Sequence, residues 1–291
     1  MPTRKGSGLH PAPSRPRLVP MPLACDAHAM VIGPADRFPL AARAEGPVAD
    51  APKEVLNLLH ALLGFDRGVL VQPDCHGLDH HALVDALGAL GEGYRGVAIL
   101  GPATDAARIA LLHRAGVRAV RIDLVSQRPV VAPGRVPLDR IADPGWHVEI
   151  DAPPEALDAV RAILARTSCP VVITGTGRLP VAEGTHGAAF RALAALLTEE
   201  RRLWIKLDGA ERISVAGPPY RDVDPIARAL FEAAPDRALW GTGWPHPGLP
   251  GGAPDAGMLV DRLAAICPDR GALRRLLVEN PSRLYWRDAG A

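Results

Sequence analysis

Short apolar runs in this sequence are followed by polar side chains of the kinds that bind ligands and move protons. The candidates of this kind are His28, Asp74, Arg121, Asp123, Asp208 and Arg212. A histidine titrates near neutral pH and can accept a proton, as can a carboxylate whose environment raises its pKa. A guanidinium group binds a carboxylate through two parallel hydrogen bonds. The set can therefore bind an anion and move a proton if the fold brings it together.

The elements that must position these side chains are predicted from hydrophobic patterns. Eight β-branched or apolar runs, interpreted as strands, lie near residues 23–28, 67–72, 95–100, 117–123, 146–150, 170–174, 203–207 and 237–241. Between the strands, helical periodicity is clean over residues 78–90, 105–116, 153–166, 187–200 and 223–235. This alternation predicts a single α/β domain, a (β/α)₈ TIM barrel. Such a barrel gathers the loops that follow its strands at one end, where the candidate side chains should meet.

The beginning of the chain differs from the rest in composition. Residues 1–21 are rich in proline and charge and contain no apolar run long enough for the core of a signal peptide. We therefore expect a disordered tail over residues 1–21 and the barrel over residues 22–291.

Bulk composition excludes several classes of protein. The net charge of +1 provides no basic field for nucleic acid. No stretch approaches the ~20 apolar residues of a membrane span, so no membrane partner is expected. The four cysteines are scattered, without a C-x-x-C pair, which favours reduced thiols and a cytoplasmic location over a disulfide framework or a zinc site.

Long segments of the chain carry a family resemblance. The clearest are CDAHAMVIGPADRFPL (25–40), VLVQPDCHGLDHHALVDAL (69–87) and ALWGTGWPHP (238–247), and shorter ones lie at 116–125, 144–150, 171–178 and 203–214. Together they resemble the amidohydrolase-2 family of the amidohydrolase superfamily, closest to its 2-pyrone-4,6-dicarboxylate lactonase-like members. The resemblance covers roughly residues 24–286, and it implies the same barrel.

The resemblance also shows where this chain departs from the family. Of the histidine pair on the first strand, His28 is kept and Met30 replaces the second member. Gly175 stands in place of the histidine that follows the sixth strand, and Gly243 in place of the aspartate that follows the eighth. Because a thioether is a weak ligand for Zn²⁺ or Mn²⁺ and glycine offers no ligand at all, we expect no metal and no other cofactor.

A substrate site is implied by the same comparison with the family. Its residues would be Arg121, Arg128, Arg212, Met30, Gly175, Gly243 and Trp244. In the lactonase branch, arginines hold the substrate carboxylates. Arg121 has an alternative role, because it could instead pair with Asp123 or Glu149 at the rim.

Three carboxylates stand where the family usually carries uncharged residues. They are Asp74, Asp123 and Asp208. Together at one mouth they would repel a dicarboxylate, so the substrate is expected to differ from the family's. Each acid alone is expected more often to form a rim salt bridge or cap a loop than to act as a base.

His28 has two alternative roles. It could be a neutral base hydrogen-bonded to Asp26 or to a backbone carbonyl, or it could be packed among apolar side chains with no chemical role. If the chain is an enzyme, His28 is the leading base, with Asp74, Asp123 and Asp208 behind it.

Three functions are compatible with these residues. The first is hydrolysis of a lactone or similar cyclic ester, without metal, through a rearranged site. The second is a catalytically inactive protein that binds a small ligand or a partner. The third is a non-hydrolytic isomerase or cyclase, which the wider pocket left by Gly175 and Gly243 would permit. In each case the expected ligand is a small molecule carrying a ring or a carboxylate, and the sequence does not indicate an oligomeric state.

Overall fold

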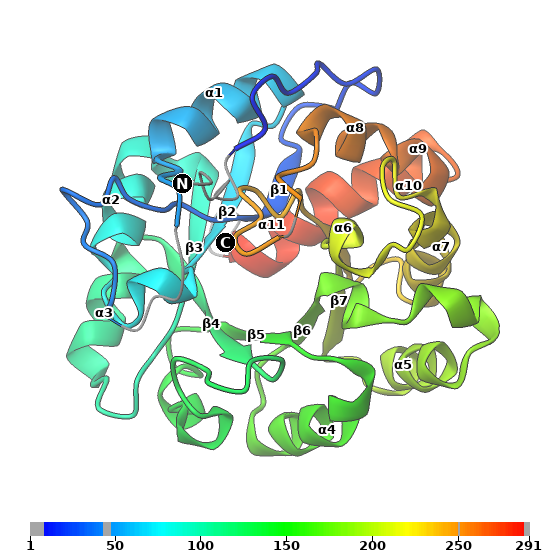
Figure 1. The fold of residues 1–291 in the computed structure, drawn as a ribbon. Helices are drawn as coiled ribbons and strands as arrows, with labels where there is room; N and C mark the ends of the chain where they lie inside the picture. The colour runs from blue at the N-terminus through cyan, green and yellow to red at the C-terminus, as the bar shows by residue number, and fades with distance from the viewer. Residues whose placement is uncertain (1–8, 43–47, 250, 288–291) are drawn as a thin grey trace, which may run out of the picture.

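The computed structural model describes residues 9–42, 48–249 and 251–287, and in it eight parallel strands form one sheet in the order β1 to β8 (Figure 1). The strands are β1 (Cys25–Ala29), β2 (Arg67–Val71), β3 (Tyr94–Ala98), β4 (Val117–Asp123), β5 (His147–Asp151), β6 (Val171–Thr174), β7 (Leu203–Leu207) and β8 (Ala238–Trp240). A parallel bridge between Ala29 and Trp244 brings the two ends of the sheet together. Each predicted strand falls on an observed one, so the predicted (β/α)₈ barrel is confirmed.

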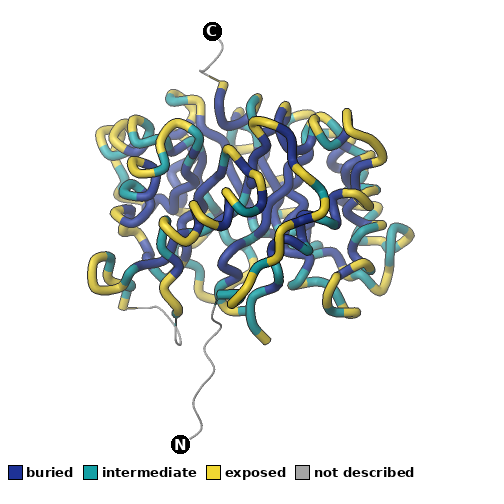
Figure 2. Tube along the Cα trace, turned by 90° about the horizontal axis from the view of Figure 1, so that it is seen from above, coloured by how far each residue is buried: buried dark blue, intermediate teal, exposed yellow. Residues whose placement is uncertain are grey.

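Helices surround the sheet (Figure 1). They are α1 (Lys53–Leu63), α2 (His81–Leu90), α3 (Ala106–Arg114), α4 (Leu157–Arg166), α5 (Ala188–Glu199), α6 (Ala210–Ile213), α7 (Asp224–Ala233), α8 (Ala256–Asp261), α9 (Leu263–Ile266), α10 (Arg270–Arg274) and α11 (Asn280–Tyr285). The five helices predicted from periodicity correspond to α2, α3, α4, α5 and α7. Each presents an apolar stripe to the sheet, which places the buried residues inside the molecule and the exposed ones on the outer ring (Figure 2).

The interior of the barrel is packed with side chains. Alternate strand residues point inward, and Val69, Val97, Val172 and Leu239 form an apolar cluster there. Tyr285, at the end of α11, joins this cluster and is fully buried. The barrel is therefore a filled core, and a ligand can approach only from an end.

A charged pair lies inside this core. Lys206 Nζ is 2.7 Å from Glu149 Oε2, and the side chains are 0% and 1% exposed. The Tyr285 hydroxyl donates a hydrogen bond to the other carboxylate oxygen of Glu149. Burial would raise the pKa of Glu149, but the charge of Lys206 holds that pKa well below its ordinary value.

The chain before β1 differs from the expected tail. Residues 1–8 lie outside the described residues, whereas residues 9–21 run along the surface of the barrel. The backbone N–H of Ser14 donates to Asp255 Oδ1 at 2.8 Å, and those of Arg17 and Leu18 donate to Asp261 Oδ1 at 2.7 and 2.9 Å. Two carboxylates at α8 thus hold a segment whose composition predicts disorder, because they satisfy backbone donors that would otherwise need water.

Two observations concern the cysteines and the possibility of a membrane span. All four cysteines are free, and Cys25, Cys169 and Cys267 are buried. Among the helices that the structure describes, none is long and apolar enough to span a membrane.

Candidate active site

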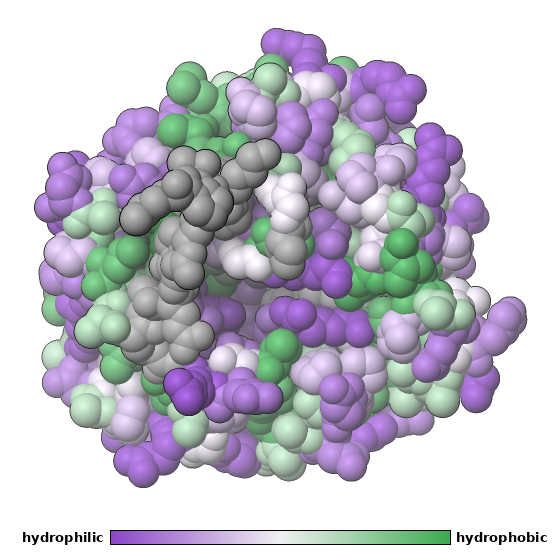
Figure 3. All heavy atoms as spheres, in the orientation of Figure 1, coloured by the Kyte–Doolittle hydropathy of each residue, from purple (hydrophilic) through white to green (hydrophobic). Residues whose placement is uncertain are grey.

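A cavity of about 760 Å³ opens at the carboxyl ends of the strands. Its lining residues follow β1, β2 and β4 to β8, so loops far apart in the sequence converge on one space. Figure 3 views this face, and hydrophilic side chains gather near its middle. Ten of the eleven predicted site residues line the cavity: His28, Met30, Asp74, Arg121, Asp123, Arg128, Gly175, Asp208, Arg212 and Gly243.

The eleventh predicted residue, Trp244, is placed elsewhere. Its side chain is 5% exposed and packs in the hydrophobic core. Its carbonyl oxygen accepts a hydrogen bond from the N–H of Met30 at 2.7 Å. Trp244 therefore joins the segment after β8 to β1 and does not line the ligand space, because its ring enters the apolar layer beside the barrel.

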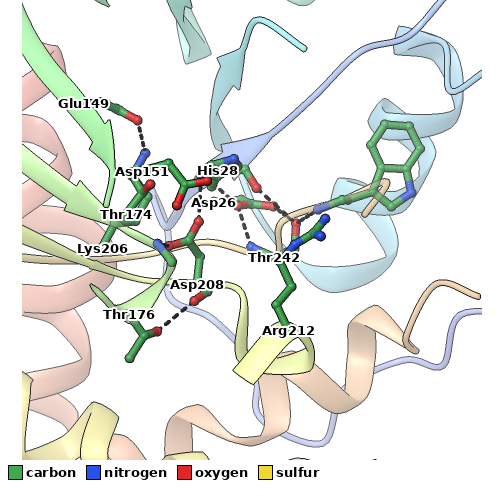
Figure 4. Close-up of polar contacts among 12 residues, drawn as sticks. Asp26, His28, Glu149, Asp151, Thr174, Thr176, Lys206, Asp208, Arg212 and Thr242 are labelled. Carbon is green, nitrogen blue, oxygen red and sulfur yellow. Dashed lines mark hydrogen bonds and ion pairs between the residues drawn. The ribbon is translucent and has the colours of Figure 1, made fainter. Parts of the chain in front are cut away.

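His28 and Asp208 form the closest pairing of a base and an acid in the cavity (Figure 4). His28 Nδ1 lies 2.7 Å from Asp208 Oδ2, although the direction of approach is bent away from an ideal hydrogen bond. The side chains are only 12% and 5% exposed. The other oxygen of Asp208 accepts a hydrogen bond from the backbone N–H of Gly175 at 2.6 Å. The Asp208 carboxylate, which follows β7, is thus held by the backbone after β6 while it contacts the His28 ring on β1.

Asp26, one of the two expected partners of the His28 ring, turns away from the cavity. Its carboxylate accepts hydrogen bonds from Thr242 N at 2.9 Å and from the backbone N–H of His28 at 3.0 Å, and it contacts His60 Nε2 at 3.2 Å. Burial raises the pKa of Asp26, but the hydrogen bonds from His60 and Thr242 outweigh it and lower that pKa. Asp26 therefore fixes β1 against the end of β8, and the His28 ring takes Asp208 as its partner.

Arg121 is held by an acid that sequence analysis did not pair with it. Its Nη1 is 2.6 Å from Asp74 Oδ1, and its side chain is 13% exposed. Burial lowers the pKa of Arg121, but the charges of Asp74 and Asp151 overcome this and raise it. The expected alternative partners, Asp123 and Glu149, are bound elsewhere.

Asp123 has the role of a loop cap. Its Oδ1 accepts hydrogen bonds from the backbone N–H groups of Val125 and Ser126 at 2.8 and 2.9 Å. This local bonding is usual for an aspartate at the start of a loop. It places the carboxylate at the cavity wall without an ion pair to Arg121.

A second ion pair in the cavity was not predicted from the sequence. Arg178 donates from Nε and Nη2 to the two oxygens of Asp151, at 2.6 and 2.7 Å. Alternation along β5 could have identified Asp151, because His147 and Glu149 occupy the preceding inward positions. Arg178 follows β6 in a left-handed turn, with φ of 47°, and no local pattern marks that position for the cavity.

A second missed pair lies under Gly243. Glu211 Oε1 is 3.0 Å from His246 Nδ1, and the two side chains are 2% and 0% exposed. A Cβ added at Gly243 would lie 3.5 Å from His246 Nδ1 and 3.7 Å from Glu211 Oε1. A carboxylate at position 243 would therefore lie next to the carboxylate of Glu211.

The cavity walls carry nearly balanced charge. Its acids are Asp74, Asp123, Asp151, Asp208 and Glu211, and its arginines are Arg121, Arg128, Arg178 and Arg212. Arg121 and Asp74 neutralise each other's charge, and so do Arg178 and Asp151. Arg212 Nη2 donates to the carbonyl oxygen of Pro247 at 2.9 Å, and its Nε lies 3.7 Å from Glu211 Oε1. A ligand thus meets acceptors as well as donors, which does not suit a dianion.

The donor set does not fit a catalytic metal. Within the described residues, no group of three or more histidine, cysteine, aspartate or glutamate side chains is arranged to hold an ion. Met30, Gly175 and Gly243 line the cavity at the positions where the family resemblance implies ligands. With His28 next to Asp208 alone, the ring of ligands that Zn²⁺ requires is incomplete.

Freeing Arg121 should create an anion site. We expect Asp74→Asn to strengthen binding of an aromatic dicarboxylate such as phthalate by roughly tenfold or more, because a charge-assisted hydrogen bond contributes about 1.5–3 kcal/mol. Isothermal titration calorimetry measures this directly. Asp123→Asn is the matched control, since it removes the same charge from the same cavity but leaves Arg121 bound to Asp74. Equal gains in the two variants would contradict the role given to Arg121.

Known proteins resemble this chain in sequence and in structure. The family model described as amidohydrolase matches residues 24–287. A 2-pyrone-4,6-dicarboxylate hydrolase of Comamonas testosteroni is 40% identical over 287 residues, covering 94% of this chain and 93% of that protein. A 4-sulfomuconolactone hydrolase of Rhizobium radiobacter is 36% identical, covering 90% and 89%. A crystal structure of an Agrobacterium tumefaciens protein in its apo form superposes with a TM-score of 0.81 at 26% identity, covering 93% of this chain and 98% of that one.

Proposed function

Because this chain belongs to the amidohydrolase family, we propose that it hydrolyses a lactone or similar cyclic ester without a metal, with His28 as the general base. Two of its relatives are named as a 2-pyrone-4,6-dicarboxylate hydrolase and a 4-sulfomuconolactone hydrolase, which supports the reaction class. Gly243 stands at the position where the family resemblance implies the general base. Another residue must therefore accept the proton of the attacking water. His28 is a proton acceptor at the wall of the cavity.

The contact between His28 and Asp208 carries this proposal. With Nδ1 turned to the carboxylate at 2.7 Å, Nε2 is the ring nitrogen left to accept a proton from water. When the ring becomes positively charged, Asp208 stabilises it at short range, as a carboxylate does in other histidine-based sites. A general base of this kind typically contributes 10²–10⁴ in rate.

The remaining walls suggest how the ester is held. Arg212 and Arg128 line the cavity, and Arg212 is bound through Nη2 to the carbonyl oxygen of Pro247 at 2.9 Å. They would bind one carboxylate of the substrate or polarise its carbonyl group. The proposed substrate therefore carries fewer negative charges than a dicarboxylate.

A lactone panel with three variants tests the function. We expect hydrolysis of at least one monoanionic or neutral lactone, with kcat/KM reduced by about 10²–10⁴ in His28→Gln and by a smaller factor in Asp208→Asn. His81→Gln is a matched control, because His81 also contacts an aspartate, Asp79, at 2.6 Å but is 78% exposed, on the outside of the barrel. A pH-stat measures acid release during hydrolysis.

Metal dependence is tested on the same substrate. We expect activity to survive dialysis against EDTA, and elemental analysis to find much less than one transition metal per chain. Stoichiometric zinc or manganese that is lost in His28→Gln would contradict the metal-free mechanism. Ligand binding seen as a thermal shift, with no turnover of any lactone, would instead show an inactive binding protein.

A further inference from the structure

A second hollow lies at the opposite end of the barrel from the proposed active site. Its volume is about 540 Å³, and its walls are the segments that lead into β6, β7 and β8, together with the end of α7 and the α11 region. The charged residues among its described lining are Arg201, Arg202, Arg237, Arg283, Arg287 and Asp236. Five arginines thus face one concave space with a single acid.

Arg237 is rigidly placed at this hollow. Its Nη1 donates to the carbonyl oxygens of Leu197, Glu200 and Leu203 at 2.9, 3.2 and 2.6 Å. These bonds use one nitrogen, and its Nε and Nη2 make no hydrogen bond with the described residues. The guanidinium group is therefore fixed in position with donors left over.

Two other arginines are also fixed by their surroundings. Arg202 Nη2 is bound to Glu200 Oε2 at 2.9 Å. The guanidinium of Arg283 lies over the ring of Trp204, 5.4 Å from its centre. This cation–π contact orients the group. Its Nη2 donates to the carbonyl oxygen of Asp236 and to Asn280 Oδ1, so Nε and Nη1 are the donors that the described residues leave available.

Charge compensation at the hollow is incomplete. Arg201, Arg237, Arg283 and Arg287 form no ion pair with any carboxylate of the described residues, and the Asp236 carboxylate is 3.7 Å from Arg275, which is not part of the lining. Burial, and next the charge of Arg201, lowers the pKa of Arg237. Four like charges around one space repel one another unless an anion enters.

We propose that this hollow binds a small, multiply charged phosphate compound. A tetrahedral phosphate can accept hydrogen bonds from guanidinium groups on several sides, whereas a planar carboxylate suits one or two. A small ligand fits better than nucleic acid, because the site is concave and the net charge of the chain is only +1. Such binding is independent of the proposed hydrolysis, since the two sites lie at opposite ends of the barrel.

Calorimetric titration of the full-length protein with pyrophosphate tests the site. At low salt we expect saturable binding with a dissociation constant below ~1 mM, weakening as salt screens the arginines. The double variant Arg201→Gln, Arg287→Gln should bind at least tenfold more weakly. Both residues are exposed, so the fold should be kept, which the melting temperature without ligand verifies.

Two control variants distinguish binding in this hollow from binding at the outer surface or in the active-site cavity. Arg161→Gln removes an exposed arginine on α4, outside the hollow, and Arg212→Gln removes an anion donor of the proposed active site. Both should bind pyrophosphate like the wild type. Loss of binding in Arg212→Gln would place the anion in the other cavity and overturn the proposal. Absence of saturable binding up to 10 mM, taken as about ten times the expected constant, or equal affinity for citrate, would overturn it as well.

Discussion

Hydrolysis of 2-pyrone-4,6-dicarboxylate by this protein is expected to be slower by several orders of magnitude than by a family member that keeps the strand-eight aspartate. The chain has Gly243 at that position and Met30 and Gly175 where the resemblance implies histidines. A base is typically worth 10²–10⁴ in rate, and preorganised polarising groups contribute a comparable factor. In addition, Asp74 occupies Arg121, so the dianion also loses a binding group.

Restoration variants sharpen this expectation. Gly243→Asp alone should not rescue the reaction, because the new carboxylate would lie beside Glu211 and the carbonyl group would still lack its histidines. The triple variant Met30→His, Gly175→His, Gly243→Asp should recover only part of the activity. Gly175 has a φ of 66°, a left-handed conformation that strains a histidine.

The measurement is a direct spectroscopic assay of pyrone ring opening by the wild type and both variants. Wild-type turnover within tenfold of the ~10 s⁻¹ median of enzymes would contradict the loss of the family reaction. It would mean that His28 and Asp208 have taken over the work of the missing groups.

Replacing Lys206 with methionine should destabilise the fold by about 3–5 kcal/mol at neutral pH. The substitution leaves the Glu149 carboxylate buried inside the barrel without the cation that lies 2.7 Å away. Chemical unfolding followed by circular dichroism gives the free energy of unfolding. The double variant Glu149→Gln, Lys206→Met is the matched control and should recover much of the loss, because no isolated charge then stays buried.

The pH dependence of this variant has a defined sign. In the wild type, Lys206 holds the pKa of Glu149 below its ordinary value, so the stabilisation is present above the unfolded-state pKa and is lost as the pH falls through the folded-state pKa. Without Lys206, burial dominates and raises the pKa of Glu149. The variant should therefore lose stability as the pH rises and lie closer to the wild type near pH 5 than near pH 8. A deficit that does not vary with pH would contradict this role for Lys206.

Several features of the protein were determined by the sequence alone. The period of two in short apolar runs and the helical period between them depend on local backbone geometry, and they predicted all eight strands and the barrel. Because a barrel collects the ends of its strands, the same pattern brought ten predicted site residues to one cavity. The replacements at Met30, Gly175 and Gly243 are likewise visible without a structure.

Tertiary structure alone decided which of these side chains contact one another. The sequence allowed His28 to contact Asp26, but the paths of the loops place Asp208 beside it. It likewise allowed Arg121 to pair with Asp123 or Glu149, but in the fold Arg121 pairs with Asp74. The path of residues 9–21 along the surface likewise depends on carboxylates at α8, which lie more than two hundred residues away in the sequence. Ion pairs and backbone hydrogen bonds depend on distances of a few ångström between remote segments. Periodicity fixes the face on which a side chain lies, but only the packed fold sets those distances.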